Sequence, residues 1–325
     1  MKKIGRELTD MIQAQNIRKR FGSVEALAGL SLSIPEGSIY GLVGSNGAGK
    51  STLLRILAGV YRPDAGTVTI DEKAVWENPE AKSLIAYVSD EVYAPPGVSM
   101  NRMAELQEAV FERFDRERFT QLSKLFELDT NRSLGTFSKG MKRQAAIALA
   151  LARRPKYLLL DEAFDGLDPV MRRMVRGLIA DELLENKMTA VITSHSLREL
   201  EDTCDTLALL HRGGLILESD IGTLKTNLFK VQVAFEEPFD ETRFKSLEIM
   251  SYKKTGSVAT LIVRGDSDEA VQILRAQDPV LLDILPLTLE EVFDYEMEAL
   301  GYSFAPESLS FIRSDEAKTR TSDSK

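Results

Sequence analysis

The chain lacks disulfide chemistry and long hydrophobic runs. Cys204 is the single cysteine among 325 residues, so no intrachain disulfide can form, as in proteins of a reducing compartment. The longest apolar runs, such as AAIALALA (145–152), fall far short of the roughly 20 residues of a membrane-spanning helix. The N-terminal segment has the cations of a signal peptide but no continuous apolar region. We therefore expect a cytoplasmic protein that needs a second polypeptide for any role across a membrane.

The chain also lacks excess positive charge. Its formal net charge is −9, whereas proteins that bind nucleic acid are generally basic, so we expect no nucleic-acid partner. Internal repeats and long heptad runs are missing too, which excludes solenoids and coiled coils. The hydrophobic content of 43% is ordinary for a globular protein, and the length favours a large domain plus a small one.

The first two thirds of the chain read as an α/β core with a helical insertion. Short β-rich runs end near residue 90, and the pattern from about 95 to 155 is helical, with apolar residues three and four apart. The apolar runs KYLLLDE (156–162) and MTAVITSH (188–195) have the length of strands that are buried in a parallel sheet. We therefore predict a core domain over residues 12–225 with a helical subdomain at about 95–155.

A second pattern follows GTLK (222–225). Strand and helix signals alternate in the order βαββαβ, which predicts a small ferredoxin-like α+β domain over 226–302. The polar residues 303–325 are predicted to be disordered.

The segment GSNGAGKST (44–52) has the spacing G-x-x-x-x-G-K-[ST] and lies between an apolar strand and a predicted helix, which is the context of a phosphate-binding loop. Glycines let the backbone amides surround a phosphate, the lysine reaches the β- and γ-phosphates, and the serine hydroxyl binds Mg²⁺. The alternative is a glycine turn followed by a chance Lys-Ser pair. The expected nucleotide-binding residues are Gly44, Ser45, Asn46, Gly47, Ala48, Gly49, Lys50, Ser51 and Thr52.

Two further stretches place polar residues at the ends of buried strands, where α/β proteins bind ligands. Asp161 can hold Mg²⁺ together with Ser51, and Glu162 can polarise the water that attacks a γ-phosphate. His195, after the next strand, can position that water. The alternatives are that the two acids cap the following helix and that His195 is a structural residue.

The segment FSKGMKRQ (137–144) precedes an apolar helical stretch. Taken alone, Ser138 is an ordinary helix N-cap. The order of these four motifs, however, resembles the nucleotide-binding subunits of ABC transporters over about residues 12–225. By this resemblance 44–52 is Walker A, 137–144 the signature motif, 157–162 Walker B, Asp165–Asp168 the D-loop and His195 the H-loop. Phe21 stands where the family places an aromatic residue that stacks on adenine.

The resemblance implies an ATPase that closes as a dimer over two ATP molecules with Mg²⁺ and drives transmembrane permease subunits. Lys50, Glu162 and His195 would be catalytic, while Ser138 and the Gly140 amide would contact ATP bound to the opposite subunit. That subunit is a second copy or a different ATP-binding chain. The protein would lie on the inner face of the cell membrane, and the LPLTLEEVFDYEMEAL stretch (285–300) resembles the ending of exporter ATPases.

This chain departs from the family pattern at two places. Phe137, Lys139 and Met141 replace the first, third and fifth residues of the usual Leu-Ser-Gly-Gly-Gln signature. Asp90 stands where the family has the Q-loop glutamine; a carboxylate there can still act on Mg²⁺.

Other classes of protein share these motifs. ABC-type heads of DNA-clamping proteins carry long coiled coils between Walker A and the signature, whereas Ser138 follows Lys50 by only 88 residues here. A soluble ABC-type ATPase that acts on a protein assembly or on nucleic acid remains the alternative function, although soluble translation factors usually hold two cassettes. A degenerate module without hydrolysis is disfavoured by the presence of Lys50, Asp161, Glu162 and His195.

Overall fold

The computed structural model describes residues 10–93 and 95–299, so the predicted disordered tail at 303–325 lies outside the described residues. The chain divides into two compact units. The first unit runs to His195 and takes in Asp202–Glu218, and the second consists of Ser196–Glu201 and the residues from Ser219 onward.

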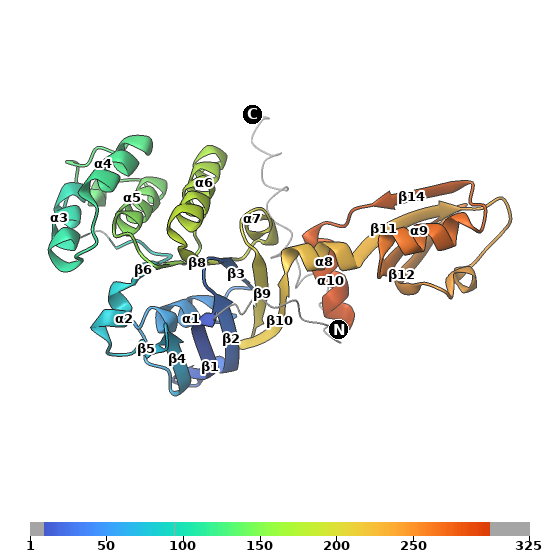
Figure 1. The fold of residues 1–325 in the computed structure, drawn as a ribbon, viewed down its shortest axis with the longest axis horizontal. Coiled ribbons are helices and arrows are strands. Elements are labelled where there is room, and N and C mark those ends of the chain that lie inside the picture. Colours follow the sequence, from blue (N-terminus) through green and yellow to red (C-terminus); the bar gives the residue numbers. More distant parts are fainter. Residues whose placement is uncertain (1–9, 94, 300–325) are drawn as a thin grey trace, which may run out of the picture. The chain divides into compact units, whose positions relative to one another are not determined.

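A six-stranded sheet forms the centre of the first unit (Figure 1). Its strands, from edge to edge, are β10 (Gly214–Asp220), β9 (Thr206–His211), β3 (Ile39–Val43), β8 (Thr189–Ser194), β7 (Tyr157–Leu160) and β6 (Ile85–Val88). Strands β9, β3, β8, β7 and β6 run parallel. Every residue of β3, β7 and β8 is buried, as in parallel sheets that are covered on both faces. The predicted α/β core is confirmed.

An antiparallel sheet of the same unit packs with helix α1 (Lys50–Leu57). Its strands are β2 (Val24–Pro35), β1 (Asp10–Phe21), β4 (Ala65–Ile70) and β5 (Lys73–Ala74), in that order. The sequence does not predict β1. Its alternation of apolar residues breaks between Ala14 and Ile17, where Asn16 has a φ of 50° and the register shifts, because a β-bulge inserts an extra residue into the period of two.

The helices from 100 to 152 gather in one layer, shown in green in Figure 1. They are α3 (Met100–Val110), α4 (Arg116–Leu125) and α5 (Lys139–Ala152), with a 3₁₀ turn η1 (Leu134–Thr136) between the last two. Each helix begins at a polar cap, Ser99, Asp115 or Ser138, whose side chain accepts a hydrogen bond from a first-turn amide. The helical insertion thus follows from cap residues and apolar spacing. The unit also contains α2 (Pro79–Ser83) and α6 (Pro169–Asn186).

The second unit is built around a four-stranded antiparallel sheet of order β12-β13-β11-β14. Its elements are α7 (Leu197–Glu201), α8 (Ile221–Asn227), β11 (Leu228–Ala234), η2 (Glu241–Phe244), β12 (Glu248–Thr255), β13 (Val258–Arg264), α9 (Ser267–Arg275), β14 (Leu281–Leu285) and α10 (Leu289–Ala299). The helix expected at 240–247 forms only the 3₁₀ turn η2. Threonine and phenylalanine, which are weak helix formers, make up half of that turn.

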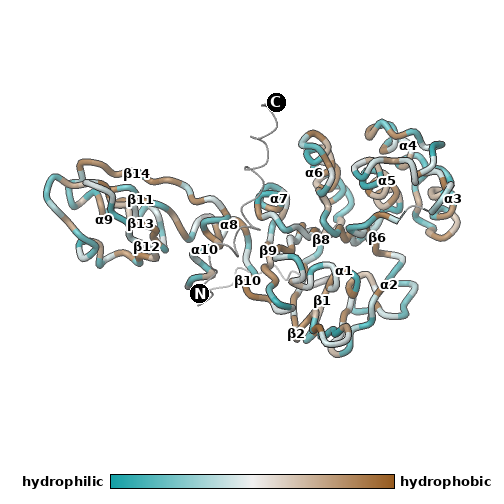
Figure 2. The backbone as a smooth tube through the Cα atoms, turned by 180° about the vertical axis from the view of Figure 1, so that it is seen from behind, coloured by the Kyte–Doolittle hydropathy of each residue, from teal (hydrophilic) through white to brown (hydrophobic). Residues whose placement is uncertain are grey.

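Within the described ranges, no helix combines the length and the apolar character that crossing a membrane requires. Figure 2 shows brown and teal stretches alternating along the tube.

Candidate functional site

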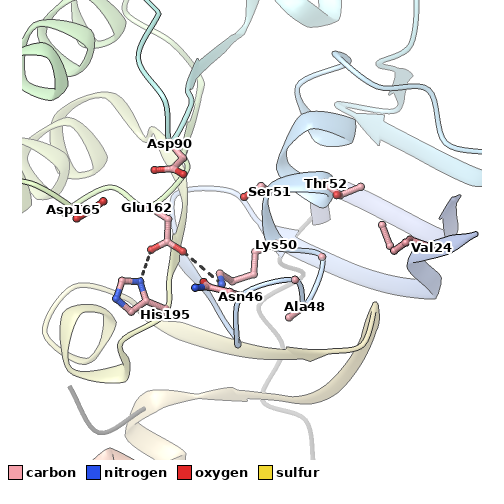
Figure 3. A pocket seen from close by; sticks show the side chains of 13 residues that line it. Val24, Asn46, Ala48, Lys50, Ser51, Thr52, Asp90, Glu162, Asp165 and His195 are labelled. Carbon is pink, nitrogen blue, oxygen red and sulfur yellow. Dashed lines mark hydrogen bonds and ion pairs between the residues drawn. The ribbon is translucent and has the colours of Figure 1, made fainter. Parts of the chain in front are cut away.

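A cavity of about 460 Å³ opens at the carboxyl ends of β3, β7 and β8, within the first unit (Figure 3). Ligands of α/β proteins bind at this edge of the sheet. The lining residues are Val24, Ala26, Asn46, Gly47, Ala48, Gly49, Lys50, Ser51, Thr52, Asp90, Glu162, Asp165 and His195. Most of the residues predicted to bind nucleotide therefore meet in one pocket.

The predicted phosphate loop connects β3 to α1. Gly49, directly before the helix, has a φ of 107°, and a Cβ at this position would lie 2.5 Å from the carbonyl oxygen of Ala26. Only glycine fits here without strain. Lys50 is 5% exposed, and its Nζ donates to the carbonyl oxygen of Gly44 at 2.7 Å. The ammonium group is thus held at the mouth of a helix N-terminus, where anions bind favourably.

Asp161 is completely buried at the end of β7. Its Oδ1 accepts hydrogen bonds from Ser51 Oγ at 3.0 Å and from Thr193 Oγ1 at 2.8 Å. Carboxylate and hydroxyl oxygens are the ligands that Mg²⁺ prefers, so Ser51 and Asp161 fit this ion. The part of the chain that the structure describes contains no cluster of three or more His, Cys, Asp or Glu side chains suited to a metal. A magnesium ion would therefore take its other ligands from phosphate and water, as is common for this ion.

Glu162 lies between Lys50 and His195. Its Oε1 is 3.5 Å from Lys50 Nζ and its Oε2 is 2.9 Å from His195 Nδ1 (Figure 3). Burial favours the neutral acid, but the hydrogen bond from His195 and the charge of Lys50 outweigh it and lower the pKa of Glu162 below its ordinary value. Glu162 also has a φ of 49°, a strained conformation of the kind found at functional sites. The geometry provides an ionised carboxylate beside the phosphate loop.

The signature segment does not line this pocket. Ser138 caps α5 by accepting a hydrogen bond from the Met141 amide at 3.2 Å, so the expected capping role is present. A Cβ at Gly140 would lie 2.6 Å from the carbonyl oxygen of Gly166, so the start of α5 lies against the segment that follows Glu162. A salt bridge of 2.5 Å between Lys139 and Asp165 joins the same two segments.

Two predicted site residues occupy different surroundings from those expected. Phe21 is 45% exposed and does not line the cavity; its ring meets Tyr61 edge-on at 5.5 Å. Val24 and Ala26 of β2 line the cavity instead. Asp90 does line the cavity, and its Oδ1 lies 3.5 Å from Nη2 of Arg143.

Three site residues are missing from the sequence-based prediction. The Thr193 hydroxyl donates a hydrogen bond to Asp161 and accepts one from the Glu162 amide at 2.8 Å. Tyr87 donates to the other oxygen of Asp161 at 3.4 Å, and the buried Arg143 contacts the backbone around the site. A signal exists only for Thr193, a polar residue directly after the apolar run 190–192.

The comparisons with known proteins agree with this site. The family model described as ABC transporter matches residues 27–165. The daunorubicin/doxorubicin resistance ATP-binding protein DrrA of Streptomyces peucetius is 30% identical over 83% of this chain and 82% of its own length. The chain belongs to the ABC transporter ATP-binding proteins. YtrB of Bacillus subtilis, another such protein, is 29% identical over 87% of this chain and 97% of its length. This ABC ATPase also matches a relative named for probable sulfate/thiosulfate import, CysA of Chlorella vulgaris, over 63% of this chain.

The fold of the cassette has solved counterparts. The dimeric bacterial ABC transporter cassette MJ0796 is 24% identical and aligns with a TM-score of 0.60 over 65% of this chain and 99% of its own. The ABC ATPase therefore contains an ATP-binding cassette fold.

Proposed function

We propose that this ABC ATPase closes as a dimer over two ATP molecules, hydrolyses them with Mg²⁺ and thereby drives partner membrane subunits. The observation that carries the proposal is the meeting of Lys50, Ser51, Asp161, Glu162 and His195 at one edge of the sheet. The site supplies a cation that can bind phosphate, oxygen atoms that can bind a metal, and an ionised carboxylate that can orient a water molecule.

Within the proposed reaction, Lys50 binds the β- and γ-phosphates and the loop amides surround them. Glu162 orients the attacking water in line with the γ-phosphate, and His195 holds the carboxylate through the contact of 2.9 Å. Ser51 and Asp161 would hold Mg²⁺, which neutralises charge that develops on the phosphate oxygens. Asp90 lines the same cavity.

The signature helix completes the site of the opposite subunit in this proposal. Ser138 is exposed at the N-terminus of α5, a helix of 14 residues whose dipole favours an anion there. The Ser138 hydroxyl and the Gly140 amide would contact the γ-phosphate of an ATP molecule bound to the partner. Phe21, half-exposed next to Val24, would reach the adenine from the side of β1. The partner is a second copy or a different ATP-binding chain.

We propose export as the direction of transport, on the inner face of the cell membrane. The similarity to DrrA, a protein named for drug resistance, extends over 83% of this chain and therefore beyond the cassette. The match to a protein named for sulfate import covers 63%. The transported molecule is read by the membrane subunits.

Co-purification tests the transport function. Tagged Glu162→Gln protein, which should hold ATP without turnover, is recovered from native membranes with MgATP, and its partners are identified by mass spectrometry. We expect a polytopic membrane protein in stoichiometric yield. Recovery of a soluble assembly or of nucleic acid instead would overturn the transport function and leave the ATPase chemistry intact.

A further inference from the structure

Arg143 is a buried cation at the junction of three segments of the ATP site. It lies on α5, five residues after Ser138, and is 1% exposed. Its Nη1 donates to the carbonyl oxygens of Ser89 at 2.8 Å and Asp161 at 3.0 Å, and its Nη2 donates to the carbonyl oxygen of Asp90 at 2.7 Å. One guanidinium therefore joins the signature helix, the segment after β6 and the end of β7.

These carbonyl oxygens satisfy the N–H groups but do not balance the charge. A buried cation without a compensating anion is costly. Asp90, Asp165, Asp161 and Glu162 all attract the charge of Arg143, and Asp90 does so most strongly. The carboxylate of Asp90 lies 3.5 Å from Nη2, with 44% of the Asp90 side chain exposed. Asp90 is therefore the main counter-ion of Arg143.

The pairing of Asp90 with Arg143 also affects the charge that lines the cavity. Asp90 and Glu162 both line the cavity (Figure 3). Glu162 contacts the cation Lys50 and the imidazole of His195, as described above. The additional carboxylate of Asp90 would repel a triphosphate unless a cation balanced its charge. Arg143 supplies that balance from the interior.

We propose that Arg143 is a positioning residue for ATP hydrolysis. It holds Asp90 and the backbone of Asp161 in one arrangement, and it transmits a displacement of α5 to the ATP site. The inference rests on the proposed function, because the displacement of α5 would come from Ser138 meeting the partner's ATP. A shift of α5 moves the guanidinium, and its three carbonyl contacts pull on the segments that carry Asp90, Asp161 and Glu162. Asp90 in this arrangement acts as a partner of Arg143 and not as a metal ligand.

A double-mutant cycle tests the pair. The variants are Asp90→Asn, Arg143→Gln and the double variant, with Arg143→Lys in place of Arg143→Gln if the latter does not fold. Each single change lowers kcat by about 10-fold, and the double change lowers it by about the same factor, because residues that act as a unit are lost together. A loss of about 100-fold in the double variant, the product of the single losses, would overturn the inference.

Nucleotide affinity without metal measures the net charge that faces ATP. Equilibrium dialysis with ATP and EDTA should show binding to Asp90→Asn tightened by about fivefold, the size of one screened charge interaction, since the cation is then unbalanced. The control Glu91→Gln removes the neighbouring exposed carboxylate and should change affinity by less than about twofold.

The competing role for Asp90 gives a different result. If Asp90 binds the metal, Asp90→Asn raises the Mg²⁺ concentration needed for half-maximal hydrolysis, which would contradict our proposal. If Asp90 is the partner of Arg143, that concentration stays unchanged. Failure of the proposed function looks different again, because Glu162→Gln protein would then stay at the monomer mass with ATP bound.

Discussion

Glu162 Oε2 lies 2.9 Å from His195 Nδ1, although the two residues are 33 positions apart in the chain. The register of the parallel strands explains the contact: Leu160 of β7 pairs with Ile192 of β8, so the residues that follow each strand arrive at the same edge. Because this register brings the carboxylate and the imidazole together, the functional pair depends on the core of the sheet and not on the loops alone.

Removal of the imidazole tests the role of this pair. In His195→Ala, we expect kcat to fall by about 100-fold or more, because Glu162 loses the group that holds it, whereas the Kd for ATP changes by less than about threefold. Phosphate release and equilibrium dialysis measure the two quantities. A fall in ATP affinity as large as the fall in kcat would show that His195 serves binding rather than hydrolysis.

Removal of the phosphate-loop cation tests the binding site. Lys50→Ala deletes the ammonium group that faces Gly44 and Glu162, so we expect the Kd for ATP to rise by about 10- to 100-fold, the value of one charge-assisted contact or more. Lys124→Ala, on the exposed side of α4, is the matched control and should bind as the unaltered chain does. Unchanged affinity in Lys50→Ala would contradict the assignment of the loop.

Thr193 is expected to support the site from within the sheet. Thr193→Val keeps the shape but removes the hydrogen bond to Asp161 and the acceptor for the Glu162 amide. We expect the free energy of unfolding to fall by about 1–3 kcal/mol and kcat to fall with it. Urea unfolding measures the first quantity. Thr120→Val, on an exposed helix face, should lie within about 0.5 kcal/mol of the unaltered protein.

Ser138 has two expected roles, as a helix cap and as a contact to the partner's ATP. Comparison with the helix cap Ser99 can separate them. Ser138→Ala and Ser99→Ala each remove an N-cap and should each lower the free energy of unfolding by about 1 kcal/mol. Only Ser138→Ala should weaken ATP-dependent dimerisation, measured by sedimentation with MgATP. Equal dimerisation in both variants would leave Ser138 as a helix cap alone.

The sequence predicts the parts of this molecule whose signals are local. The spacing in GSNGAGKST, the apolar runs before Asp161 and His195 and the cap at Ser138 each lie within a few residues, and the structure contains the corresponding loop, strands and helix. Strand β1 escaped prediction because the bulge at Asn16 interrupts its alternation.

Contacts between distant segments could not be predicted. Arg143 reads as one more cation at a helix start, and only the packing of α5 against Ser89 and Asp161 reveals that it is buried. Thr193 acquires its role from the neighbouring strand β7. The placement of Phe21 outside the cavity likewise depends on how β1 and β2 pair.

The most direct test of the account is the mass of Glu162→Gln protein with MgATP, measured by light scattering on a sizing column. The monomer has a mass of 36.2 kDa, and the account predicts a species of twice this mass that retains ATP and dissociates when Mg²⁺ and nucleotide are removed. A particle that remains at the monomer mass while ATP binding is demonstrated by dialysis would contradict the closure of two cassettes over ATP.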